Sequence, residues 1–229
     1  MLYLTDFFSL VFPRICPACG NSLWKNERGI CHACEYHLPK TNFHFDAENP
    51  VSRLFWGRAD IVTAAAFLYF HKGNKVQRLV HQLKYKGRKD IGIFLGEMYG
   101  ETLKYAPLFN ASDVIIPVPL HKKRYMKRGY NQSEQFGIGL GNVMKIPVNR
   151  HLLARVKATE TQTRKSRFSR YQNVKEIFRV ERPEEWENRH LLLVDDVITT
   201  GATLESCILA LQVIPGVKIS VACIATAMI

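Results

Sequence analysis

No apolar run in the 229-residue sequence is long enough to cross a membrane as a helix. The sequence also lacks internal repeats and low-complexity tracts, which argues against repeat and fibrous proteins. The opening residues, MLYLTDFFSLVF, have no basic leader and contain Asp6, so they do not predict a secretory signal and fit a short packed helix equally well. We therefore expect a cytoplasmic globular protein.

Acidic residues are scarce where basic residues gather, and the formal net charge is +12 at pH 7. Residues 72–89 contain seven Lys or Arg and no acid, and residues 121–130 contain five and no acid. Residues 150–175 contain eight, so the three segments hold 20 of the 32 basic residues. This clustering favours a phosphate-rich partner, either nucleic acid or a polyphosphorylated small molecule. A solvated basic surface is the alternative.

The stretch LLLVDDVITTGAT, residues 191–203, combines apolar, acidic and hydroxyl residues in a fixed order. Leu191 to Val194 predict a buried strand of a parallel sheet, with Asp195 and Asp196 at its ligand-binding carboxyl end. A hydroxyl-rich loop and a helical pattern follow, and a helix start favours a phosphate. The carboxylates suit sugar hydroxyls, or a magnesium ion through water. An acidic strand end with a threonine that merely caps a helix is the alternative.

Two CxxC pairs near the amino terminus predict a structural zinc site. The sequence CPAC is followed by eleven residues and then CHAC, which gives Cys16, Cys19, Cys31 and Cys34 as ligands. Four thiolates would close a tetrahedral site and leave no position for a catalytic water. A disulfide framework is the alternative, although nothing in the sequence indicates an oxidising compartment. Further possible ligands are His32 and His37.

Strand and helix patterns alternate through the rest of the chain, which predicts a parallel α/β sheet. The expected strands are residues 61–70, 114–116, 146–156, 177–180, 191–194 and 217–229, and the expected helices are residues 76–87 and a segment from about residue 90. Pro117 and Pro119 end one strand, so the basic segment 121–130 is expected to be a loop at the ligand-binding edge. The expected division of the chain is a zinc-ribbon-like module (1–45), a linker (46–57) and a main domain (58–229).

The sequence resembles the ComF family, the competence-protein-F-like proteins with a phosphoribosyltransferase domain. The 191–203 stretch resembles the binding motif for phosphoribosyl pyrophosphate in type I phosphoribosyltransferases. The narrower match rests on PVPLHKKR, RGYNQ, LKYKGRKD (83–90), the CxxC pairs, Thr159-x-x-Gln162, Arg170-x-x-Asn173 and Phe178. The resemblance covers nearly the whole chain. It implies a type I phosphoribosyltransferase-like parallel sheet flanked by helices, with a small amino-terminal zinc-binding module.

The resemblance also implies roles for the residues of the motifs. Phosphoribosyl pyrophosphate would bind with magnesium, and the phosphoribosyl group would be transferred with release of pyrophosphate. Asp195 and Asp196 would contact the ribose hydroxyls, while Lys122 and Arg124 would face the pyrophosphate. The 5-phosphate loop would comprise Thr199, Thr200, Gly201, Ala202 and Thr203. The flexible loop that closes over the site would include Thr159, Gln162, Arg170 and Asn173.

A second hypothesis is a non-catalytic protein that senses the ligand or binds single-stranded DNA during DNA uptake, where ComF proteins are implicated. The sequence identifies no general base and no pocket for an acceptor. A single strand would follow a basic patch of Lys123, Lys127, Arg128, Arg164, Lys165 and Arg167. Its bases would stack on Tyr125, Tyr130, Phe168 or Tyr171.

Overall fold

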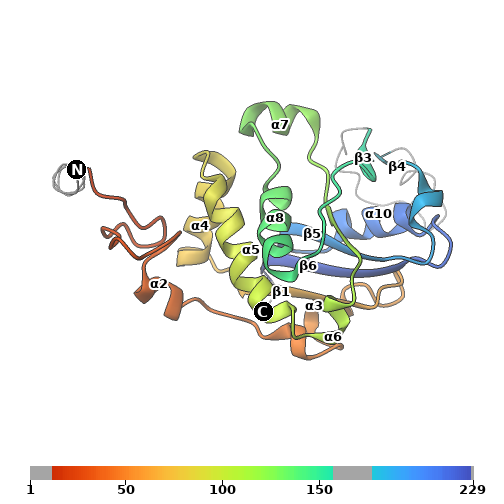
Figure 1. The fold of residues 1–229 in the computed structure, drawn as a ribbon, viewed down its shortest axis with the longest axis horizontal. Helices are drawn as coiled ribbons and strands as arrows, with labels where there is room; N and C mark the ends of the chain where they lie inside the picture. Colours follow the sequence, from red (N-terminus) through yellow and green to blue (C-terminus); the bar gives the residue numbers. More distant parts are fainter. Residues whose placement is uncertain (1–11, 157–176, 228–229) are drawn as a thin grey trace.

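The computed structural model describes residues 12–156 and 177–227 (Figure 1). Its helices are α2 (His32–Tyr36), α3 (Pro50–Arg53), α4 (Lys75–Tyr85), α5 (Lys89–Leu103), α6 (Pro107–Asn110), α7 (Lys122–Arg128), α8 (Gln132–Met144) and α10 (Ala202–Leu211), with short 3-10 helices η1 (Phe43–Phe45) and η2 (Pro183–Trp186). Its strands are β1 (Thr63–Tyr69), β2 (Val114–Pro117), β3 (Leu153–Arg155), β4 (Phe178–Val180), β5 (His190–Ile198) and β6 (Lys218–Thr226). None of these helices is long and apolar enough to span a membrane.

Four strands form a parallel sheet in the order β1-β6-β5-β2. Strands β3 and β4 form a separate antiparallel pair that lies above α10 in Figure 1. Parallel neighbours need crossover connections, and helices supply them between the strands. The predicted parallel α/β sheet flanked by helices is confirmed.

The two faces of the sheet are covered by different helices, as the alternation of side chains along a strand requires. On β5, Leu192 and Val194 pack in one apolar cluster with α4, α5 and α8. Leu191 and Leu193 point to the opposite face and pack with α10 and residues around α3. Both faces are therefore dry, which explains the continuous apolar run at 191–194.

Helix α8 was not predicted from the sequence, and glycines are the reason. Its segment QSEQFGIGLGNVM contains three glycines, which lower intrinsic helix propensity. One of them, and a glycine of α5, are needed for packing. A Cβ at Gly139 would lie 2.1 Å from the carbonyl oxygen of Ile93, and one at Gly96 of α5 would lie 2.2 Å from that of Phe136. The glycines thus let α5 and α8 pack closely, and this contact places the start of α8 beside the sheet.

The segment 46–57, expected as a linker, packs on β1. Asn49 caps α3 through its side-chain oxygen, and its amide nitrogen donates to the carbonyl of Ala64 at 2.7 Å. Val51 and Phe55 are fully buried. The division into 1–45, 46–57 and 58–229 stays a prediction, but residues of the middle segment belong to the core that supports the sheet.

Candidate functional site

The acid pair, Asp195 and Asp196, lies on β5 where the neighbouring strand β2 has already ended. Strand β2 ends at Pro117, which pairs with Val194, whereas β5 continues alongside β6 to Ile198. The predicted strand end at Val194 was therefore too early, because pairing with β6 alone keeps the chain extended. The proline that ends β2 leaves one side of the acid pair open to groups from other elements.

Asp195 is held by the start of α8. Its Oδ1 accepts hydrogen bonds from Ser133 Oγ and from the backbone N–H of Asp196, each at 2.8 Å. Burial and then the adjacent charge of Asp196 raise the pKa of Asp195 to about 7, against its usual value of 3.8. Asp195 is therefore poised to exchange a proton near neutral pH.

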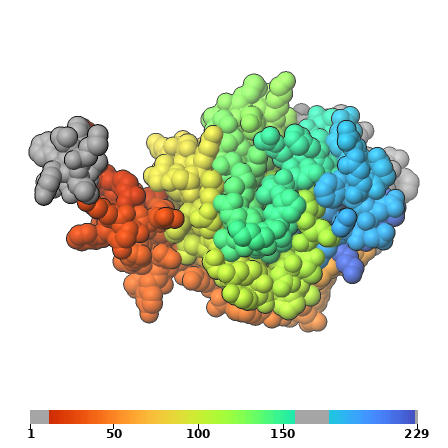
Figure 2. Space-filling model, viewed as in Figure 1, coloured from red at the N-terminus to blue at the C-terminus, as the bar shows by residue number. Residues whose placement is uncertain are grey.

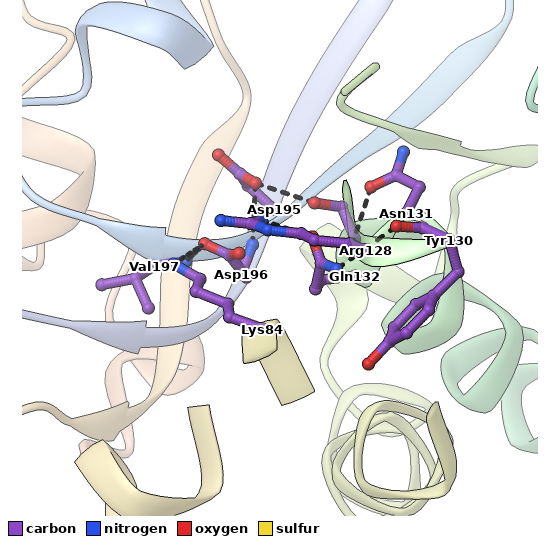
Figure 3. Close-up of polar contacts among 9 residues, drawn as sticks. Lys84, Arg128, Tyr130, Asn131, Gln132, Asp195, Asp196 and Val197 are labelled. Carbon is purple, nitrogen blue, oxygen red and sulfur yellow. Dashed lines mark hydrogen bonds and ion pairs between the residues drawn. The ribbon is translucent and has the colours of Figure 1, made fainter. Parts of the chain in front are cut away.

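Asp196 is held by the end of α4. The ammonium Nζ of Lys84 lies 2.9 Å from Asp196 Oδ1, and the same oxygen accepts the backbone N–H of Val197. Figure 3 shows Lys84 reaching up from the end of α4 to the acid pair, with Arg128 extending toward it from α7. Ser133 and Lys84 were not assigned to the site from the sequence, although Lys84 belongs to the quoted LKYKGRKD segment.

The RGYNQ segment, residues 128–132, joins α7, α8, α4 and the end of β2. Asn131 caps α8 by accepting from the N–H of Ser133, and its amide donates to the carbonyl of Val118 at 2.9 Å. Arg128 donates to the side chain of Gln132 at 2.6 Å. These contacts fix the position of Ser133, so the segment supports the acid pair through the hydroxyl that binds Asp195.

The expected 5-phosphate loop connects β5 to α10 and is open to solvent. Thr199, Thr200, Ala202 and Thr203 are exposed, and no side chain of the described residues caps α10. Gly201 stands at the helix start with φ +73°, a conformation that favours glycine. Arg58 donates to the carbonyl of Thr200 at 3.1 Å and forms an ion pair with Glu205 of α10. These two contacts fix the loop to the start of the helix. A free helix start of this kind suits an anion.

The basic segment after Pro119 forms the short helix α7 rather than the predicted loop. Its N-terminal cap is His121, whose side chain accepts from the N–H of Lys123. The exposed basic residues of α7 are Lys122, Lys123, Arg124 and Lys127. None of these four forms an ion pair with the acid pair within the described ranges. The structure thus places them near the same edge of the sheet without direct contact to the carboxylates.

The aromatic residues expected to stack on bases divide into three groups. Tyr125 is 50% exposed on α7. Tyr130 is buried, and its hydroxyl donates to the carbonyl of Leu83, so the prediction that it stacks on bases is wrong. Phe168 and Tyr171 lie outside the described residues, as do the predicted loop and patch residues Thr159, Gln162, Arg164, Lys165, Arg167, Arg170 and Asn173.

Arg155, at the end of β3, is a site residue that the sequence patterns did not single out. Its guanidinium lies over the ring of Phe178 with Cζ 5.5 Å from the ring centroid. Burial lowers the pKa of Arg155. The charge of Arg124 also lowers this pKa, whereas the charge of Asp195 raises it. The apolar pattern around LLAR predicts only a strand, so no signal in the sequence indicated that the charge of Asp195 would act on this arginine.

The four predicted zinc ligands converge. The Sγ atoms of Cys16, Cys19, Cys31 and Cys34 all lie within 4.8 Å of one another. All six cysteines of the chain are free thiols, which disfavours the disulfide framework. A set of four convergent thiols fits a tetrahedral zinc ion.

Backbone groups and neighbouring side chains support the cysteine cluster. The N–H of Cys31 donates to Cys16 Sγ at 3.4 Å. Although burial opposes it, such hydrogen bonds lower the pKa of Cys16 to about 7. His32 lies instead beside the carboxylate of Glu35, and the ring of His37 forms a hydrogen bond with the carbonyl of Ala33. Figure 2 shows the cysteine segment in red beside α4 in yellow.

Comparison with curated proteins identifies relatives along most of the chain. The DNA utilization protein YhgH of Escherichia coli O157:H7 is 30% identical over 215 residues, which cover 85% of this chain and 89% of the relative. Competence protein F of Haemophilus influenzae is 43% identical over 93 residues, covering 40% and 41% of the two chains. Competence protein ComFC of Bacillus subtilis is 24% identical over 192 residues, covering 83% and 68%. No family model matches the sequence.

Comparison with solved structures gives matches of low similarity. The glutamine phosphoribosylpyrophosphate amidotransferase of B. subtilis matches with TM-score 0.42 and 19% identity, over 62% of this chain and 30% of that one. Adenine phosphoribosyltransferase from Leishmania tarentolae matches with TM-score 0.38 and 13% identity, over 82% and 94%.

The sheet, the acid pair and the exposed loop before α10 define an α/β protein with a candidate ligand site at the carboxyl edge of a parallel sheet. The extent of the match to YhgH, together with the two competence proteins, identifies the family: the chain belongs to the ComF family.

Proposed function

We propose that the protein binds phosphoribosyl pyrophosphate with magnesium and transfers the phosphoribosyl group to an acceptor with release of pyrophosphate. The observation that carries the proposal is the continuity of β5 with the loop before α10. One strand bears both carboxylates and leads, without an intervening element, to a helix start at Gly201 whose neighbours Thr199, Thr200, Ala202 and Thr203 are exposed. A ribose 5-phosphate offers hydroxyls to the first feature and a phosphate to the second.

The residues would divide the ligand between them. Asp195 and Asp196 accept hydrogen bonds from the ribose hydroxyls, and the backbone of residues 199–203 binds the 5-phosphate. Lys122 and Arg124 of α7 face the pyrophosphate. Magnesium, when bound with the ligand, would supply further positive charge to the pyrophosphate oxygens.

The chemical step would depend on charge placement. Pyrophosphate leaves from the anomeric carbon through a cationic, oxocarbenium-like transition state, and the acceptor takes its place on that carbon. The acid pair would stabilise the positive charge on the sugar, while the basic side chains of α7 stabilise the negative charge on the leaving group.

Titration calorimetry with phosphoribosyl pyrophosphate and magnesium tests the binding proposal. Gly201→Val should weaken binding at least tenfold, because φ +73° strains any residue with a Cβ and the new side chain would start 3.5 Å from the ring of Phe55, so the backbone proposed to bind the phosphate must shift. Gly73→Val is a matched control, since Gly73 has φ +84° and lies outside the site with no atom within 4 Å of its Cβ position. Equal affinity of wild type and Gly201→Val, or no binding by wild type, contradicts the proposal.

A screen for pyrophosphate release across nucleobases and small amines tests the transfer step. An acceptor that accelerates release over the rate without acceptor supports a transferase. Binding without any accelerating acceptor supports the second function, in which the ligand acts as a signal and no group is transferred.

The second candidate function is an accessory role in DNA uptake, with single-stranded DNA as a partner. Two observations favour it: related proteins are named for competence and DNA utilisation, and α7 presents an exposed basic surface with Tyr125 beside it. A bound strand should lose affinity steeply as salt rises, since each neutralised phosphate releases counterions. Fluorescence anisotropy at several salt concentrations measures this. A flat response, or binding unchanged when Arg164, Lys165 and Arg167 are all replaced by Ala, leaves only the small-ligand role.

A further inference from the structure

The ion pair between Lys84 and Asp196 connects the ligand site to a helix that carries no part of the phosphoribosyl motif. Its atoms lie 2.9 Å apart, and only 21% of the Lys84 side chain and 14% of the Asp196 side chain are exposed. An ion pair with so little exposure is screened less by salt and held more firmly than a surface pair.

The end of α4 is anchored on both sides of Lys84, so the ammonium has a fixed position. The carbonyl of Leu83 accepts the hydroxyl of Tyr130. The ring of Tyr85 lies under the guanidinium of Arg128, with Cζ 5.4 Å from the ring centroid. Three consecutive residues of α4 therefore make contacts with other elements: Leu83 with the segment between α7 and α8, Lys84 with β5, and Tyr85 with the last residue of α7. Exposed lysines at helix ends ordinarily lack such fixation, and this arrangement sets Lys84 apart from them.

The charge of Lys84 has a specific consequence for Asp196. Asp195 and Asp196 are adjacent carboxylates, and two like charges at close range disfavour full ionisation of the pair. Lys84 is the cation that ion-pairs with Asp196 among the described residues. Without it, Asp196 would lose the contact that orients its carboxylate, and Asp195 would more readily keep its proton, because the charge of Lys84 lowers the pKa of Asp195. A protonated carboxyl has fewer sites that accept a ribose hydroxyl.

We propose that Lys84 is a positioning residue for ligand binding: its ammonium holds the carboxylate of Asp196 oriented toward the ribose hydroxyls. This inference rests on the proposed function, since it assigns Lys84 a part in binding the same ligand. Lys84 acts through Asp196 and does not contact the ligand.

Calorimetry with phosphoribosyl pyrophosphate and magnesium on four single variants provides the first test. Lys84→Met keeps the aliphatic stem but loses the charge, and it should weaken binding at least tenfold. Lys84→Arg restores a cation and should recover affinity to within about threefold of wild type, which a purely structural role of the lysine stem would not predict. Lys86→Met removes an exposed charge from the same helix end and should leave affinity unchanged. Asp196→Asn removes the partner carboxylate.

A double-mutant cycle provides the second test. If Lys84 acts only through Asp196, Lys84→Met combined with Asp196→Asn should bind no more weakly than Asp196→Asn alone. Additive losses would mean that Lys84 contacts the ligand directly, and they would overturn the positioning role. Equal affinity of wild type and Lys84→Met would overturn the inference while leaving the proposed function intact. Failure of wild type to bind the ligand would instead refute the proposed function. Thermal unfolding of each variant shows whether a loss of affinity comes from misfolding. If Lys84→Met is misfolded, the affinity of Lys84→Arg tests the positioning role in its place.

Discussion

Replacing Asp195 by Asn should make the protein more stable at high pH, because the ligand site holds a carboxyl in surroundings that oppose its ionisation. The folded pKa of Asp195 is about 7, against its usual value of 3.8. Between these two values the folded protein retains a proton that the unfolded chain has released. Stability therefore falls as pH rises from about 4 to about 7 and is level above that range.

The magnitude follows from the size of the shift. A shift of about 3 pKa units corresponds to roughly 4 kcal/mol, since one unit is about 1.4 kcal/mol. Asp195 is partly exposed and shares its titration with Asp196, so we expect about half of this, about 2 kcal/mol. An asparagine keeps the side-chain oxygen that accepts from Ser133 and carries no charge.

Urea unfolding of wild type and Asp195→Asn between pH 5 and pH 8.5 measures the effect. The variant's advantage in free energy of unfolding should grow with pH and level off above pH 7. Asp60→Asn, at an exposed carboxylate, controls for the loss of one negative charge. A difference between wild type and Asp195→Asn that stays constant across the pH range would refute the reasoning.

Three further predictions concern the supporting structure. Cys31→Ser should reduce zinc from one ion per chain to well below that level in metal analysis, while Cys223→Ser, at a buried cysteine outside the cluster, should keep it. Gly139→Ala should destabilise the protein by about 2 kcal/mol in urea unfolding, because the new Cβ meets the backbone of α5; an unchanged midpoint would show that the two helices can separate at no cost. Tyr130→Phe should lower the free energy of unfolding by about 1 kcal/mol by removing a buried hydrogen bond to the end of α4, whereas Tyr125→Phe, half exposed on α7, should have no measurable effect.

Most of the sheet could be predicted from the sequence because its strands are buried on both faces and lack polar interruptions. The apolar runs at 61–70 and 217–229 became β1 and β6, and the run before Asp195 became the first part of β5. The end of β5 was missed because pairing partners decide it: the acid pair stays extended beside β6 after β2 has ended. Helix α8 was missed because its glycines serve contact with α5, which local propensity does not encode.

Site residues could be predicted where a continuous motif carries them. The acid pair and the loop at 199–203 lie on one strand, one turn and one helix start, so their order in the chain gives their order in space. Ser133, Lys84 and Arg155 come from three other elements, and their contacts depend on how those elements pack. The four cysteines were found because two short turns fix each pair, and ligand spacing then follows from the sequence.

The transferase and the accessory protein place different demands on α4. One flank of this helix holds Asp196 through Lys84, and the other side meets the cysteine segment, where Arg78 donates to the carbonyl of Ala18 at 3.3 Å. Between these contacts, Val76, Leu79, Val80 and Leu83 are buried, so the inner face of the helix is closely packed against the core. A transferase needs α4 to stay fixed so that Asp196 remains in place throughout the reaction. A sensor needs the ligand to change the Lys84–Asp196 pair, and α4 is the element that would carry this change to the cysteine segment. Under either proposal the same ion pair would be involved, and the two would differ in whether it persists when the ligand binds.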